Sequence, residues 1–82
     1  MLQEQIAALE LPDAILTVIN NLLRGLDTAS TVEDLERERA YQIRLIRDLE
    51  VARRLRPAVI ETLFMSFDSA VQQRHRELVD QP

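Results

Sequence analysis

Hydrophobic residues recur along this chain at spacings of three and four, which is the period of an α-helix that buries one face. The pattern is interrupted at Pro12, in the stretch GLDTAS, and at Pro57. These interruptions divide the chain into four segments, so we expect helices over about 2–10, 12–24, 31–56 and 57–79. The last segment has the most regular apolar face, made of Val59, Ile60, Leu63, Phe64, Phe67, Ala70, Val71 and Leu78.

Local signals suggest where these helices begin and end. Gly25 is expected to end the second helix in a left-handed conformation, because glycine adopts positive φ without a steric penalty. Ser30 and Glu33 have the spacing of a capping box at the start of the third helix. Pro57 suits the first position of a fourth helix and a sharp corner, which predicts an antiparallel hairpin.

A single long helix is the alternative to the hairpin. The spacing of threes and fours continues through Pro57, from Val32 to Ala70. A kinked helix of about 50 residues would have this property. Polar residues such as Gln42 interrupt the series and weaken a simple coiled coil, so the hairpin is favoured.

The length of the chain limits its architecture. Its 82 residues form one domain (1–82) with a thin margin of stability. A helix over 31–56 would be about 39 Å long, which exceeds the diameter of about 30 Å expected for a compact chain of this size. Cysteine is absent, which leaves oligomerisation as the usual remedy for a small core. We therefore expect an all-α protein, a small elongated helical bundle or helical hairpin completed by dimerisation.

Charge and hydropathy restrict the environment and the partners. Fourteen acidic and ten basic residues give a net charge of −4, so the chain as a whole does not attract nucleic acid or an anionic membrane. The N-terminal stretch is acidic rather than basic, unlike a secretory signal. No apolar run approaches the 18 or so residues that span a bilayer. These features predict a soluble, cytoplasmic protein.

Every basic residue is an arginine, and seven of the ten lie within residues 35–57. On a helical wheel, four of them project in the same direction and could contact phosphates; they are Arg37, Arg44, Arg47 and Arg54. Three of these four have an acid four residues away. A solvated surface with internal ion pairs is therefore the favoured interpretation, and a nucleic-acid site is the alternative.

The other three arginines of this stretch, Arg39, Arg53 and Arg56, fall beside the apolar face that contains Ile46 and Leu49. They either extend their charged ends into water over buried stems or meet acidic groups of a partner. In a homodimer the second copy could supply these acids from Glu36, Glu38 or Glu61. This edge is our candidate for partner binding.

Residues that support catalysis are not arranged in a recognisable pattern. Ser66 and Ser69 precede His75, the only histidine, but their spacing does not predict a catalytic triad. No metal or cofactor site is expected. The sequence favours a non-catalytic protein-interaction module, such as an adaptor, a chaperone-like partner or a small inhibitor or regulator. The alternative is a nucleic-acid-associated regulator or accessory subunit.

Overall fold

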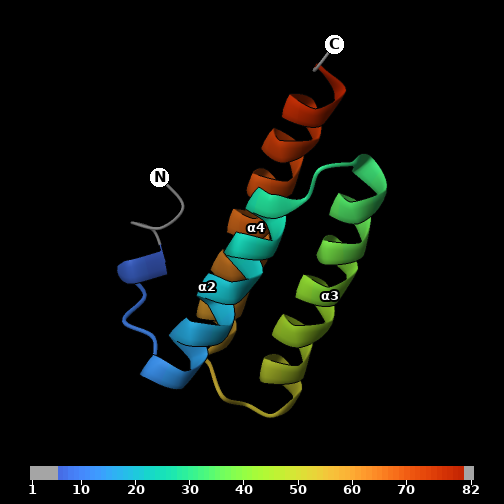
Figure 1. Cartoon of the computed structure of the whole chain (residues 1–82). Helices are drawn as coiled ribbons and strands as arrows, with labels where there is room; N and C mark the ends of the chain where they lie inside the picture. The colour runs from blue at the N-terminus through green and yellow to red at the C-terminus, as the bar shows by residue number, and fades with distance from the viewer. Residues whose placement is uncertain (1–5, 81–82) are drawn as a thin grey trace.

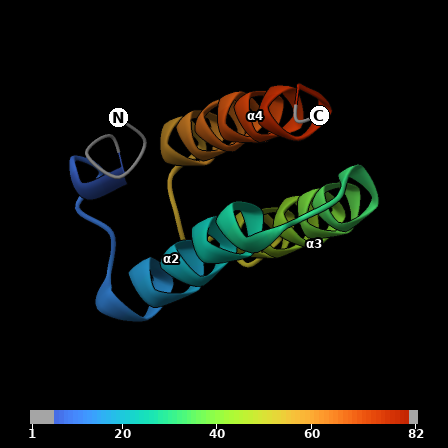
Figure 2. The ribbon, with the colours of Figure 1, turned by 45° about the horizontal axis from the view of Figure 1, so that its top comes forward.

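The helices α2 (Asp13–Thr28), α3 (Val32–Val51) and α4 (Pro57–Val79) account for most of residues 6–80, the part of the chain described by this computed structural model. They run alternately up and down (Figure 1). The tilted view of Figure 2 shows that the three helices do not lie in one plane. The expected all-α small bundle is confirmed. Pro57 is the first residue of α4, so the chain turns at this point into a hairpin and does not continue as one kinked helix.

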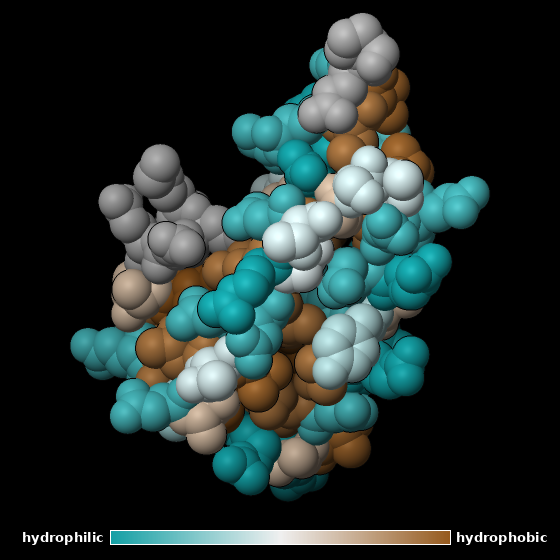
Figure 3. All heavy atoms as spheres, in the orientation of Figure 1, coloured by the Kyte–Doolittle hydropathy of each residue, from teal (hydrophilic) through white to brown (hydrophobic). Residues whose placement is uncertain are grey.

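The core is formed by residues from all three helices, and α3 packs most extensively against α4. The hydrophobic side chains that are fully or almost fully buried are Ile6, Ile15, Ile19, Leu22, Leu23, Leu26, Ala29, Leu35, Ile46, Ile60, Leu63, Phe67 and Val71. On the face drawn in Figure 3, hydrophobic side chains gather between α2 and α3, with hydrophilic residues along the outer sides of both helices. The apolar faces predicted from spacing therefore meet inside a single chain.

The helix α2 continues past Gly25, where the sequence predicted its end. The φ angle of Gly25 is not positive, so this glycine does not form the left-handed turn that the sequence predicted. A Cβ atom at Gly25 would meet the carboxylate of Glu38, the far end of a flexible side chain on α3, so Gly25 leaves room for this side chain. The helix ends instead at Thr28, because the C-cap residue Ala29 has an extended backbone with φ −61° and ψ 124°.

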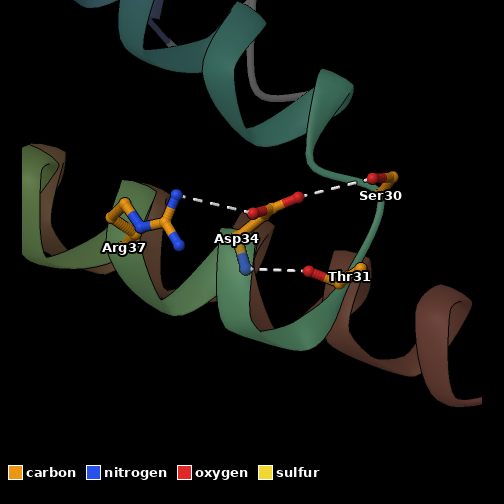
Figure 4. A network of polar contacts seen from close by, with 4 residues as sticks. All are labelled: Ser30, Thr31, Asp34 and Arg37. Atoms are coloured by element: carbon orange, nitrogen blue, oxygen red, sulfur yellow. Dashed lines mark hydrogen bonds and ion pairs between the residues drawn. The ribbon is translucent and has the colours of Figure 1, made fainter.

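The helix α3 begins one residue later than the predicted capping box implies (Figure 4). Thr31 is the N-cap, and its hydroxyl accepts a hydrogen bond of 3.0 Å from the backbone N–H of Asp34. The Asp34 carboxylate also accepts from the hydroxyl of Ser30 at 3.4 Å and pairs with Arg37 at 3.6 Å. Ser30 and Thr31 are both good caps, so adjacent residues offered two overlapping start signals.

The C-terminal end of α3 is the main departure from the sequence prediction. The helix stops at Val51 instead of Arg56, because Arg53 has a left-handed φ of 55°. The N–H of Arg53 donates to Glu50 O and the N–H of Arg54 donates to Leu49 O, each at 3.0 Å. These two bonds form a Schellman motif. Arginine rarely occupies its left-handed position, so this stop has no signal in the local sequence.

Because of the early stop, the 20 residues of α3 span about 30 Å, compared with about 39 Å for the predicted helix over 31–56. The long axis of the described chain measures 42 Å, and its radius of gyration is 12.8 Å. A helix of this length fits within the dimensions of one chain. The predicted need for a second chain to cover an over-long helix is therefore removed.

Only part of the predicted helix over 2–10 can be placed, because residues 2–5 lie outside the described residues. Ile6 to Leu9 form one helical turn, in which the N–H of Leu9 donates to Ile6 O at 3.1 Å. Glu10 then takes a left-handed φ of 53°. The buried Ile6 side chain joins the core, so this segment packs onto the bundle.

We predict that Arg53→Gly stabilises the protein by about 1 kcal/mol, because glycine adopts the left-handed conformation without a Cβ penalty. Urea unfolding followed by circular dichroism would measure this change. Arg54→Gly is the matched control and should not stabilise, since Arg54 does not have positive φ. Equal effects of the two substitutions would contradict the assignment of the helix stop to Arg53.

Candidate functional site

Two adjoining open depressions, of ≈ 380 Å³ and ≈ 300 Å³, lie between α3 and α4 and share Arg39 and Asp68 in their linings. We call them together the α3–α4 groove. Its lining residues are Glu36, Arg39, Gln42 and Ile43 from α3, and Phe64, Met65, Asp68, Val71, Gln72, His75 and Arg76 from α4. Helices that pack against each other leave such a groove along the line where their outer faces meet.

Gln42 is the unusual residue of this groove. Its side chain lines the smaller depression but is only 2 % exposed. Its Nε2 atom is buried and has no hydrogen-bond partner. A buried donor without a partner costs about 1–3 kcal/mol relative to a satisfied one. Buried side-chain polar atoms usually have a hydrogen-bond partner, and among those of the described residues this amide nitrogen and the Nε of Arg74 lack one.

Apolar side chains from both helices line the smaller depression together with Gln42. Met65 is 65 % exposed, which is high for a large hydrophobic residue at the edge of a groove. Phe64 and Ile43 are half-buried beside it, and Phe64 also packs against the core. The groove therefore offers apolar contact area close to a polar group that has no partner.

The groove is lined by equal numbers of arginine and acidic side chains, and their contacts with neighbouring side chains are exposed to solvent. Arg39 lies 3.9 Å from the carboxylate of Glu36, with side chains 44 % and 57 % exposed. Asp68 accepts a hydrogen bond of 2.9 Å from Gln72 of the next turn. Exposed pairs of this kind contribute little to stability. These contacts therefore do not hold the charged ends in fixed positions.

The structure separates the residues predicted to bind a partner. Arg39 lines the α3–α4 groove, but Ile46 is 0 % exposed in the core of its own chain. Leu49 is half-buried and packs against the same core. Arg53 and Arg56 are exposed in the loop after α3, so they do not continue the helical edge on which Arg39 lies. The cause is again the stop at Val51.

The predicted phosphate-binding arginines are divided in the same way. Arg37, Arg44 and Arg47 lie on α3 and are exposed, whereas Arg54 belongs to the following loop. Arg37 pairs with Asp34 rather than with the expected Glu33. Within residues 6–80, Arg44, Arg47 and Arg54 form no ion pair within 4.0 Å. The predicted pairing along the helix is therefore largely absent.

Sequence reasoning missed the structural role of Arg74. Its guanidinium donates a hydrogen bond of 2.8 Å to the carbonyl oxygen of Ala29 and lies 3.9 Å from Glu77. Ala29 is the C-cap of α2, so an arginine of α4 satisfies a carbonyl group at the C-terminal end of another helix. Its side chain is 23 % exposed. No local spacing could signal a contact between residues 45 positions apart.

The residues considered for catalysis are not brought together. Ser66 and Ser69 line a depression of ≈ 480 Å³ that also includes Ala8, whereas His75 lines the α3–α4 groove. Residues 6–80 contain no group of three or more side chains suited to hold a metal ion. In the same part of the chain, no helix is long and apolar enough to cross a membrane.

Comparison of the chain with protein-family models, curated proteins and solved structures gives no significant match. The geometry of the α3–α4 groove, with the buried amide of Gln42 and the loosely paired Arg39, is therefore the basis for the assignment of function.

We predict that Gln42→Met raises the free energy of unfolding by about 1–3 kcal/mol, because it removes an unsatisfied buried amide while keeping an unbranched side chain of similar shape. Urea unfolding of dilute protein would measure it. Gln73→Met, at an exposed position of α4, is the control and should have almost no effect. A destabilised Gln42→Met variant would show that the amide is already satisfied within the chain.

Proposed function

We propose that this protein is a non-catalytic interaction module that binds a partner protein in the α3–α4 groove. The observation that carries the proposal is the buried, unpartnered Nε2 of Gln42 in the lining of this groove. A partner that offers an acceptor to this amide would recover the 1–3 kcal/mol or so that the free chain loses there.

The surroundings of Gln42 support this proposal. Met65 and Phe64 provide apolar contact area, and Arg39 provides a charged donor at the edge. Methionine and arginine are enriched at protein interfaces, and a mixed apolar and polar lining is typical of them. Of the arginines predicted to bind a partner, Arg39 is the one that lines the groove, whereas Arg53 and Arg56 lie in the loop after α3.

The shape of the groove suggests the mode of binding. It follows two packed helices, and the apolar face of a further helix fits such a groove. The small bundle would act as a scaffold that presents the α3–α4 groove to the partner. The proposed role is that of an adaptor, a chaperone-like partner or a small inhibitor or regulator, and the identity of the partner determines which of them applies.

We predict that a photo-crosslinking amino acid such as p-benzoylphenylalanine forms covalent adducts when it replaces Met65, because position 65 lies at the groove. The adducts would be detected by gel electrophoresis and mass spectrometry after irradiation of cells that produce the variant. The same amino acid at Gln73 is the matched control, since Gln73 does not line the groove. Identical patterns from both positions, or no adduct from either, would contradict the proposed function.

A second candidate function is supported by a different observation. Arg44, Arg47 and Arg54 are exposed and lack ion pairs within the described residues, and Arg53 and Arg56 add further positive charge in the same loop. Unpaired arginines of this kind are suited to contact the phosphates of a nucleic acid. This function would make the protein a nucleic-acid-associated regulator or accessory subunit.

In that case, binding to DNA or RNA should weaken steeply as salt rises, because each phosphate contact releases counterions. Fluorescence anisotropy over a range of salt concentrations would measure the slope. The triple variant Arg44→Ala, Arg47→Ala and Arg54→Ala should reduce the slope by about 0.7–0.9 per arginine removed. Arg24→Ala on α2 is the control. Absence of binding at low salt would eliminate this candidate.

A further inference from the structure

We propose that the partner in the α3–α4 groove is a second copy of this chain, related by a two-fold axis. This inference rests on the proposed function, because it names the occupant of the same groove. It is independent of the sequence-based argument from helix length, which the structure removes. Three properties of the groove support it: the arrangement of its charges, the chemistry of Gln42 and the geometry of the helical hairpin.

The charge pattern of the groove is complementary to that of a second copy of the same groove. Its lining contains the cations Arg39 and Arg76 and the anions Glu36 and Asp68. A uniformly acidic or basic partner would meet like charges on this surface, whereas a second copy presents both signs. Across a two-fold axis, each contact occurs twice, so one pairing of Arg39 with Asp68 of the second copy implies a second identical pairing.

The amide of Gln42 is also complementary to itself. An amide has both donors and an acceptor, so two glutamines that meet across a two-fold axis can donate to each other's oxygen. The unpartnered Nε2 would then be satisfied by the Oε1 of the same residue in the second copy. A small movement of the overlying side chains is required, because the amide nitrogen is buried in the single chain. The exposed Met65 and Arg39 at the edge are suited to such a movement.

The hairpin of α3 and α4 has a suitable geometry. Two antiparallel hairpins that pack through their outer faces form a four-helix bundle, which is a common arrangement of helices. The shared face would be about 30 Å long and about 20 Å wide. It would bury roughly 1,200 Å² over both copies, which is at the lower limit for a specific interface. The residues that line the groove all belong to α3 and α4, so α2 does not cover this surface.

Sedimentation equilibrium over a dilution series from micromolar to millimolar tests the proposal. The wild-type chain should reach about twice the 9.5 kDa of one copy. Arg39→Asp alone and Asp68→Arg alone should each weaken the dimer roughly 10-fold or more, because like charges then face each other across the axis. Arg44→Asp, on the outer surface of α3, is the matched control and should dimerise as the wild type does.

Mixing the two variants provides the decisive measurement. When the Arg39→Asp chain meets the Asp68→Arg chain, both pairings across the axis join opposite charges again. We expect an equimolar heterodimer of wild-type affinity, which an altered contact within one chain cannot produce. Circular dichroism of each variant confirms that it folds. A monomeric wild type at all concentrations, or a dimer without rescue on mixing, would overturn the proposal.

Failure of the dimer is distinguishable from failure of the proposed function. If the second copy is the occupant, the crosslinker at Met65 should give an adduct of about twice the mass of one chain. A monomeric protein whose crosslinker at Met65, but not at Gln73, forms adducts with a different protein would overturn the dimer and leave the interaction function intact. Absence of any adduct specific to position 65 would overturn both.

Discussion

The packing of α3 against α4 is the contact on which the rest of the fold depends. Leu35 and Ile46 of α3 and Leu63 and Phe67 of α4 are all 0 % exposed, and together they remove the largest apolar surfaces of the chain from water. The helix α2 adds Ile19 to the same core. This packing determines which face of each helix points outward, and therefore which residues line the α3–α4 groove.

Gln42 occupies a position within this packing where an apolar residue would serve stability better. A chain of 82 residues has little stability to lose. In the proposed function, this amide gains its hydrogen bond on binding, as polar residues in helical interfaces often determine register and partner at a cost in stability. Arg39, Asp68 and the exposed Met65 line the same depression as this amide, so charged and apolar groups lie close to it.

The arginines show how a single backbone conformation can rearrange a surface. On a continuous helix, Arg39, Arg53 and Arg56 would share one edge. The left-handed φ of Arg53 ends the helix at Val51, so Arg39 remains at the groove while the other two lie in a loop at one end of the bundle. A Schellman motif normally contains glycine at this position, and its local sequence signal is absent here.

The sequence by itself determined the all-α class, the hairpin at Pro57 and most of the core, because the spacing of apolar residues and the chemistry of proline act locally. It also predicted a partner-binding edge that includes Arg39, a residue of the groove lining. The tertiary structure alone decided that Gly25 lies against Glu38, that α3 stops at Val51 and that Arg74 reaches Ala29. It also decided that the Gln42 amide is buried without a partner. These features depend on the approach of segments distant in the chain, or on a backbone conformation unfavourable for its residue, and neither has a periodic signal in the sequence.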